Sequence, residues 1–352
     1  MSLTRSDSPV SARQTAAPQF RKPLSVVYVE DAALSHPRTV EILAKLPGAT
    51  VIRCRDYRDV FNRPHQEPAL QKEAQALILA VSDRPRLYEG APVCQDFGNR
   101  NFYYTSDVMN CVFDCEYCYL QGMYPSGHIV VFVNLEDTFR GLDEVLSAKQ
   151  SAYVCISYDT DLLAFEPLLG YVGKWITFAA ERPNLTLELR TKSASASVLR
   201  ALPVTDRVIL ALTLSPDTVI RTCEHRTPTL ATRLALANEA IDLGWKVRLC
   251  FDPILAVHDA KAVYNDMFDE VFRTIPMDRV LDASVGLFRI SKEYLKEMRR
   301  HRPCAVTCYP YELTDGVYHY PDMIGKPLTE LAIARLTEFL PRERIALWDG
   351  TD

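Results

Sequence analysis

Three cysteines lie within eight positions of the stretch MNCVFDCEYCYLQGMY, in Cys-x3-Cys-x2-Cys spacing: Cys111, Cys115 and Cys118. Structural zinc usually takes four closed tetrahedral ligands from two Cys-x2-Cys-like pairs, and no fourth cysteine follows in this run. A cubane iron–sulfur cluster held by three thiolates instead leaves one iron open, so that a substrate or cofactor can bind there. The spacing therefore favours such a cluster; a zinc site with a distant fourth ligand, or buried thiols without a metal, are the alternatives.

The elements around the cysteine loop form a pattern of strands alternating with helices. Apolar runs predict strands at 24–30, 49–54, 76–81, 102–108, 151–157, 184–191, 207–214, 246–255 and 282–290. Amphipathic runs predict helices at 37–46, 135–149, 163–181, 195–202, 229–243 and 260–275. Helical stretches of this length between strands predict parallel βαβ units in a barrel-like or doubly wound sheet. The cysteine loop follows the strand at 102–108, the position of a first barrel strand, and such loops build the active face of a barrel.

Composition limits the class of protein and of partner. The 352 residues can form one barrel-sized domain or two smaller ones, and the net charge of −5 argues against binding nucleic acid by bulk charge alone. No apolar run approaches the ~18 residues of a membrane span, and residues 1–22 lack the apolar centre of a secretory signal. We therefore expect a protein without a membrane segment, with reduced cysteines and a cytoplasmic location. The Arg- and Ser-rich start leaves a transit peptide as an alternative.

The cysteine motif also supports a family resemblance. Its spacing after a first barrel strand, with the aromatic Tyr117 before the last cysteine, resembles the radical S-adenosylmethionine (SAM) superfamily. More narrowly, the segments CEYCYLQ, VFVNLED and CISYD resemble the spore photoproduct lyase family, and the similarity runs from VVYVE near residue 26 to RISKEYL near residue 295. That family carries a cysteine followed by Thr-Ser-Asp after the second barrel strand. This chain keeps Cys155 and Ser157, and has an additional Tyr158 before Asp159.

The resemblance implies a fold and two cofactors. The expected fold is α/β, a partial (β/α)6-type radical SAM barrel with an N-terminal α/β extension. We expect a disordered tail at 1–22, an N-terminal α/β domain at 23–95, the barrel at 96–290 and a helical or irregular C-terminal segment at 291–352. The cofactors implied are a [4Fe-4S] cluster on the three cysteines and SAM on the open iron. Reductive cleavage of SAM gives a 5′-deoxyadenosyl radical in that superfamily.

The resemblance further implies which residues act on the substrate. The family reverts the methylene-bridged thymine dimer, called the spore photoproduct, to two thymines. By residue-for-residue match, Cys155 returns a hydrogen atom to the thymine radical, and Tyr117 and Tyr119 form the relay that restores the thiol. A small residue filling a buried strand is the structural alternative for Cys155, and packing around the cluster is the alternative for the two tyrosines.

Contacts to the cofactor are implied for a further group of polar residues. Lys192 matches a family lysine that reaches the SAM carboxylate, for which an ammonium is a compact point charge. Ser157, Thr213 and Ser215 offer hydroxyls to the methionine or ribose groups, or cap the following helices. Glu224 matches a family glutamate of uncertain role. Each of these residues has a plain structural alternative, such as a solvated lysine at a helix start.

Substrate binding needs positive charge despite the acidic total. The segment 288–302, FRISKEYLKEMRRHR, places basic residues on one helical face, where they could meet DNA phosphates or simply be solvated. Arg289 matches a family arginine near the bound dinucleotide. The partners expected are damaged DNA and a reductant such as flavodoxin or ferredoxin, with the protein acting as a monomer. Cys304 and Cys308 are interpreted as structural.

Three functions are compatible with these residues. The first is repair of the methylene-bridged thymine dimer. The second is a radical SAM reaction of the same lineage on another nucleic-acid lesion or nucleotide, for which the additional Tyr158 leaves room. The third is a zinc-stabilised nucleic-acid-binding module without catalysis.

Overall fold

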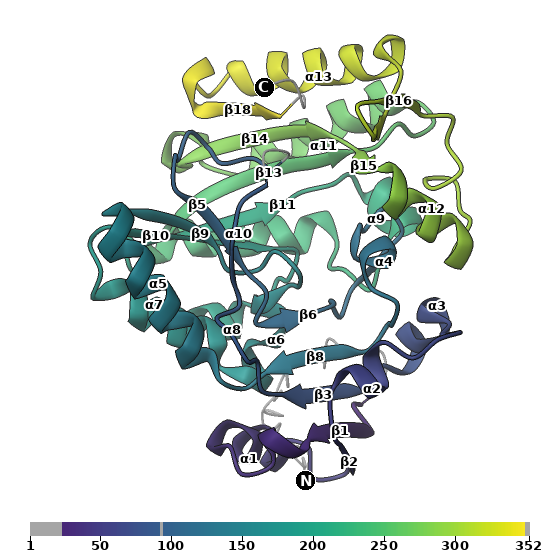
Figure 1. Ribbon diagram of the computed structural model, residues 1–352. Coiled ribbons are helices and arrows are strands. Elements are labelled where there is room, and N and C mark those ends of the chain that lie inside the picture. Colours follow the sequence, from purple (N-terminus) through teal and green to yellow (C-terminus); the bar gives the residue numbers. More distant parts are fainter. Residues whose placement is uncertain (1–22, 92–93, 349–352) are drawn as a thin grey trace, which may run out of the picture.

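Two sheets dominate the computed structural model, which describes residues 23–91 and 94–348. One has five strands in the order β2-β1-β3-β8-β6, and the other has eight in the order β18-β14-β13-β11-β10-β9-β5-β4. In Figure 1 the five-stranded sheet lies at the lower end of the molecule, and α13 (Asp322–Thr337) covers the upper end. The eight-stranded sheet lies between them.

The eight-stranded sheet contains the predicted barrel strands. They are β5 (Phe102–Thr105), β9 (Ala152–Cys155), β10 (Leu185–Thr191), β11 (Val208–Thr213), β13 (Lys246–Ile254) and β14 (Asp282–Leu287). All six run parallel to their neighbours in this order. β4 (Leu87–Glu89) joins one edge antiparallel, and β18 (Ile345–Trp348) joins the other edge parallel. Within the described residues these two edges do not pair, so the barrel is partial, as predicted.

Helices connect the barrel strands and cover their apolar face. They are α5 (Leu135–Lys149), α6 (Leu162–Leu169), α7 (Tyr171–Ala180), α8 (Ala196–Ala201), α9 (Asp217–Cys223), α10 (Leu230–Leu243) and α11 (Ala260–Thr274). α5 packs on α7 through Phe139 and Phe178, whose ring centroids lie 4.3 Å apart. Leu187 and Leu189 of β10 are fully buried in this core. One face of the barrel sheet is thus sealed by helices, which leaves the other face for the site.

The single helix predicted at 163–181 is wrong, because α6 and α7 are separate helices. Gly170 between them has φ +66°, in the left-handed region that glycine adopts at little cost. The Glu166 carboxylate then accepts hydrogen bonds from the backbone N–H groups of Val172 at 2.7 Å and Gly173 at 3.0 Å. These bonds satisfy donors at the start of α7 and fix the break.

The five-stranded sheet combines segments on both sides of the cysteine loop. It consists of β1 (Val26–Glu30), β2 (Thr50–Cys54), β3 (Leu77–Ala80), β8 (Ile129–Phe132) and β6 (Val108–Met109). Short helices accompany it: η1 (Asp31–Ala33), α1 (Pro37–Ala44), α2 (Arg58–Phe61), α3 (Pro68–Gln71), η2 (Lys72–Ala74) and α4 (Leu120–Met123). Because β6 precedes the cysteine loop and β8 follows it, this sheet holds both ends of the loop.

The C-terminal part adds a small sheet and returns to the barrel. The small sheet has the order β15-β17-β16, from β15 (Arg289–Ser291), β16 (Glu312–Thr314) and β17 (Val317–His319). In the chain, α12 (Lys292–His301) lies between β15 and β16, whereas η3 (Met277–Arg279) precedes β14 and η4 (Arg342–Arg344) precedes β18. Among the described residues, no helix has the length and apolar character needed to cross a bilayer.

Candidate active site

The cysteine loop is clamped to the barrel by a short pair of strands. β7 (Asp114–Cys115) lies in the loop and pairs antiparallel with β12 (Glu224–His225), which follows α9. The backbone N–H of Glu116 donates to the carbonyl of Cys223 at 2.8 Å. Arg302 adds an ion pair to the Asp114 carboxylate at 2.9 Å. The middle of the loop is therefore held by residues that follow the fourth barrel strand.

The N-terminal layer holds the first part of the same loop. The Lys72 ammonium, on a buried side chain, donates to the carbonyl of Cys111 at 2.6 Å and to that of Phe113 at 3.2 Å. The side-chain amide of Gln75 also donates to the Cys111 carbonyl, at 3.1 Å. Both donors come from the end of α3 and the residues after it. The backbone conformation of the loop thus depends on two side chains that no spacing rule in the sequence identifies.

The three loop thiols form a donor set that fits an iron–sulfur cluster. Cys115 is buried, and Cys111 and Cys118 are half-buried. Burial raises the pKa of each thiol, neighbouring thiolates raise the pKa of Cys115 further, and Lys192 lowers the pKa of Cys115 and Cys118. Among the described residues, no three His, Cys, Asp or Glu side chains converge on one metal ion. A cubane cluster requires no such convergence, because each thiolate binds a different iron, and soft thiolates are the ligands such clusters use.

Lys192 brings a cation to the cluster side of the barrel. Its ammonium lies over the Tyr117 ring, 5.4 Å from the centroid, and its charge acts on Cys115 and Glu224. The backbone N–H of Lys192 donates to the Asp161 carboxylate at 2.7 Å, which fixes the end of β10. Within the described residues the ammonium has no hydrogen bond or ion pair. A carboxylate of a small ligand would satisfy it, so the position fits the amino-acid part of SAM.

Glu224 is the centre of a buried polar network. It accepts hydrogen bonds from the Tyr117 hydroxyl and from the Ser215 hydroxyl, the latter at 2.7 Å, and pairs with the Arg233 guanidinium. The side chains of Glu224 and Arg233 are both 0% exposed. Arg233 also donates to the Thr213 carbonyl at 3.0 Å. Burial alone would raise the Glu224 pKa, but Arg233 and Lys192 lower it, so the carboxylate is ionised. Ser215 therefore points at Glu224 in this structure.

A second network surrounds the other predicted relay tyrosine. The Tyr119 hydroxyl donates to the backbone carbonyl of Tyr158 at 2.7 Å and lies 3.3 Å from the Asp159 carboxylate. Asp159 is buried and also accepts from the hydroxyls of Tyr124, at 2.8 Å, and Ser106. Tyr117 and Tyr119 thus flank Cys118 in the chain, but their hydroxyls are directed to two different carboxylates.

Cys155 lies at the carboxyl end of β9, on the barrel. Its backbone is in register with Tyr104 on one side and Glu188 on the other, and its side chain is buried. Burial raises the pKa of its thiol well above the usual value, the Glu188 carboxylate raises it further, and the Arg190 cation lowers it. The thiol is therefore protonated at neutral pH, the state in which an S–H bond can give up a hydrogen atom.

The additional Tyr158 packs against Tyr104 of β5 and against Tyr119, which directly follows the cysteine motif. Its ring centroid lies 4.8 Å from that of Tyr104 and 6.2 Å from that of Tyr119, and its hydroxyl is hydrogen-bonded to the Cys94 sulfur. Ser157 does not face this ring: its hydroxyl donates to the Arg190 carbonyl at 2.7 Å and accepts from the Arg190 N–H at 2.8 Å. Ser157 thus ties the end of β9 to β10.

Arg289 follows β14, and the charges of Asp252 and Tyr158 act on its guanidinium. Its guanidinium carbon is 5.0 Å from the centroid of the Trp348 ring, on β18. In the following helix α12, Lys292 and Lys296 are exposed, whereas Arg299 donates to the Thr307 carbonyl at 2.7 Å. Part of the predicted basic face is therefore available and part is used within the protein.

Several site residues have no local signature in the sequence. Lys72 acts on a carbonyl 39 positions further along the chain, and Arg233 of α10 acts on Glu224 of β12, nine positions before it. No motif near either residue predicts these contacts. Glu188 and Arg190 are two positions apart in the strand segment ELRT, so their side chains lie on the same face of the strand. This spacing is the signal that could have identified them as facing the site.

The partial barrel with a three-cysteine loop after its first strand defines the chain as a radical SAM enzyme. A family model described as spore photoproduct lyase matches residues 23–302. Spore photoproduct lyase of Clostridium acetobutylicum is 24% identical over 247 residues, which cover 68% of this chain and 71% of the relative. This chain belongs to the spore photoproduct lyase family.

Solved structures agree with the fold. Spore photoproduct lyase complexed with dinucleoside spore photoproduct superposes with a TM-score of 0.77 at 21% identity, over 93% of this chain and 99% of that one. A double mutant of spore photoproduct lyase with bound AdoMet and the same dinucleoside gives a TM-score of 0.77 at 22% identity, over 94% and 100%. At these identities the similarity shows the fold.

Proposed function

We propose that this protein is a radical SAM DNA-repair lyase that converts the methylene-bridged thymine dimer into two thymines. The observation that carries the proposal is a buried, protonated thiol, Cys155, at the carboxyl end of a barrel strand that reaches the cysteine loop through Tyr158 and Tyr119. Hydrogen return to a carbon radical needs such a thiol, sheltered from water and close to the source of the radical. The family to which the chain belongs supports the same reaction.

The cofactors are assigned to the residues that fit them. Cys111, Cys115 and Cys118 hold the [4Fe-4S] cluster, and Lys192 binds the SAM carboxylate. When bound, these cofactors supply a 5′-deoxyadenosyl radical that removes one hydrogen atom from the lesion. Glu224 fixes Tyr117 beside Lys192, and Ser215 supports Glu224. Thr213 and Ser157 stay predicted cofactor contacts; in this structure the Ser157 hydroxyl is bonded to the Arg190 backbone, and the Thr213 carbonyl accepts from Arg233.

Cys155 completes the repair after the methylene bridge of the lesion has broken. Its S–H bond breaks, and a C–H bond forms on the thymine methyl radical, which becomes thymine. The thiyl radical left on the sulfur takes a hydrogen atom from a phenol of the relay formed by Tyr119 and Tyr117, so that the S–H bond forms again, the phenol O–H bond breaks and the unpaired electron moves to the phenol oxygen. To give up its hydrogen, each phenol O–H must leave its present acceptor, which is the Tyr158 carbonyl for Tyr119 and the Glu224 carboxylate for Tyr117.

The partners follow from the same site. Arg289 binds the lesion, and the exposed basic residues of α12 contact the DNA backbone on either side. The lesion must leave the duplex to reach Cys155, at a cost of a few kcal/mol that damage reduces. A flavodoxin- or ferredoxin-type reductant supplies the electron, and the protein acts as a cytoplasmic monomer.

Anaerobic turnover tests the proposed function. The cluster is reconstituted with iron and sulfide, and dithionite, SAM and the synthetic dinucleotide lesion are added, with thymine followed by chromatography. We expect thymine dinucleotide to appear, and the Cys155→Ala variant to consume the lesion but release aberrant products. Cleavage of SAM without thymine would indicate another substrate of the same lineage. A colourless protein that binds zinc and cleaves no SAM would favour the non-catalytic alternative.

A further inference from the structure

The site-facing side of the barrel sheet is charged. Barrel interiors are usually filled with layers of branched apolar side chains. Here β10 presents Glu188 and Arg190, β13 presents Arg248 and Asp252, and β14 presents Asp282. Glu188 and Arg248 are buried, and the Arg190 and Asp252 side chains are 28% and 21% exposed. Buried charges cost free energy unless they are paired, so their partners show which of them are fully used.

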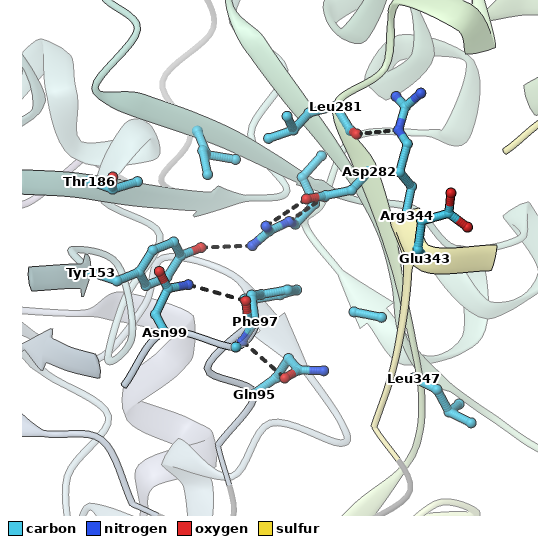
Figure 2. Close-up of a pocket in the computed structure, with 14 residues that line it drawn as sticks. Gln95, Phe97, Asn99, Tyr153, Thr186, Leu281, Asp282, Glu343, Arg344 and Leu347 are labelled. Carbon is cyan, nitrogen blue, oxygen red and sulfur yellow. Dashed lines mark hydrogen bonds and ion pairs between the residues drawn. The ribbon is translucent and has the colours of Figure 1, made fainter. Parts of the chain in front are cut away.

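Nearest the amino ends of the strands, the charged side chains of this row are hydrogen-bonded to one another. Arg248 donates to Asp282 at 2.8 Å, to Glu188 at 2.6 Å and to the Tyr153 hydroxyl at 2.7 Å. The dashed lines from Tyr153 and Asp282 in Figure 2 are two of these bonds, those to Tyr153 and Asp282, at the wall of a cavity of about 380 Å³. The hydrogen bond from Arg248 therefore fixes the Glu188 carboxylate.

At the carboxyl ends of the strands, the guanidinium of Arg190 is not fully hydrogen-bonded. The Arg190 Nε lies 3.3 Å from the Glu188 carboxylate, and its terminal nitrogen lies 3.5 Å from the Asp252 carboxylate. These are ion pairs without hydrogen-bond geometry, and the buried Nε has no hydrogen-bond partner among the described residues. The backbone of Arg190 is fixed on both sides by Ser157. Arg190 is therefore a positioned guanidinium whose N–H donors are still available.

The residues around Arg190 place its side chain in the candidate active site. Cys155 is paired in register with Glu188, and Arg190 lies two positions further along β10 on the same face of the strand. Asp252 and Arg289 both lie close to Gly286: a Cβ added to Gly286 would lie 2.9 Å from the Asp252 carboxylate and 3.4 Å from the Arg289 guanidinium. Arg190, Asp252 and Arg289 thus occupy one side of the barrel mouth, next to the hydrogen donor.

We propose that Arg190 binds an acceptor oxygen of the lesion, either a thymine carbonyl or the phosphodiester, and so positions the damaged base at Cys155. This inference rests on the proposed function. A guanidinium suits this task because its planar fork of donors matches carbonyl and phosphate oxygens and never loses its charge. Glu188 and Asp252 orient the fork without consuming its donors.

Direct binding measurements test the role of Arg190. Equilibrium dissociation constants are measured anaerobically, without reductant, for two ligands: the dinucleoside lesion, which lacks a phosphate, and the dinucleotide lesion. We expect Arg190→Gln to weaken binding about 10- to 100-fold, the range for a hydrogen bond to a charged group. Weaker binding of both ligands identifies a thymine carbonyl as the acceptor, and weaker binding of the dinucleotide alone identifies the phosphodiester. Unchanged affinity for both ligands overturns the inference.

Two further variants separate binding from folding. Arg190→Lys keeps the charge between Glu188 and Asp252 but loses the fork, so we expect an intermediate loss of affinity. Arg200→Gln is the matched control, because Arg200 pairs with Glu239 on the outer helices, and it should bind both lesions like the natural protein. SAM cleavage without lesion shows that each variant keeps its site. If the natural protein binds the lesion but releases no thymine, the proposed function fails while the role of Arg190 is still decided by the affinities.

Discussion

The buried pair of Glu224 and Arg233 gives a prediction whose size follows from the structure. Both side chains are 0% exposed, so removing one charge leaves the other without a counter-charge and without water. The Glu224→Gln substitution keeps the shape and one oxygen acceptor for Tyr117 and Ser215. Breaking a buried pair in this way costs about 3–5 kcal/mol. We expect the lower half of that range, because Arg233 keeps hydrogen bonds to the carbonyls of Thr213 and Pro228, both at 3.0 Å.

Urea unfolding of the cluster-free protein under reducing conditions measures this cost. The double variant Glu224→Gln/Arg233→Met is the control, because replacing both charges by groups of similar volume is often neutral or stabilising. We expect the double variant to recover most of the free energy of unfolding lost in Glu224→Gln. A single variant within about 1 kcal/mol of the natural protein, or a double variant no better than the single, would refute the view that the charge on Glu224 is essential to this network.

Two further predictions concern a buried acid and the cofactor lysine. Burial raises the pKa of Asp107 to about 7, so the folded protein holds its proton while the unfolded chain loses it near the ordinary value of 3.8. Stability from this group is therefore present at low pH and lost as pH rises toward 7; Asp107→Asn should gain up to about 4 kcal/mol at pH 8, at ~1.4 kcal/mol per pKa unit. It should gain nothing near pH 4, and equal effects in unfolding experiments at both pH values would contradict the assignment. Lys192→Gln should weaken SAM binding about 10- to 100-fold in equilibrium dialysis, with normal iron content, and an unchanged affinity would place the SAM carboxylate elsewhere.

The sequence predicts those parts of the molecule that depend on local patterns. The parallel barrel strands follow from alternating apolar runs, and the cysteine loop is recognised from the spacing of Cys111, Cys115 and Cys118. The break at Gly170 was missed because an amphipathic pattern continues across it, although glycine permits the left-handed backbone there. The pairing of Arg233 with Glu224 and the hold of Lys72 on the loop were also missed. Such contacts depend on side chains from separate elements, and no local pattern encodes them.

The attachment of the cysteine loop has a consequence for how natural variants should be interpreted. The loop enters and leaves through the five-stranded sheet, whereas Cys155 lies in the eight-stranded sheet and Lys192 directly follows its strand β10. The position of the cysteines relative to Cys155 therefore depends on the five-stranded sheet as well as on the β7–β12 pair that ties the loop to the barrel. A substitution such as Val29→Ala, at a fully buried position of β1, touches no reacting group but weakens the packing of the five-stranded sheet. A genetic screen for failed repair should therefore recover changes across the N-terminal sheet as well as around the cysteines.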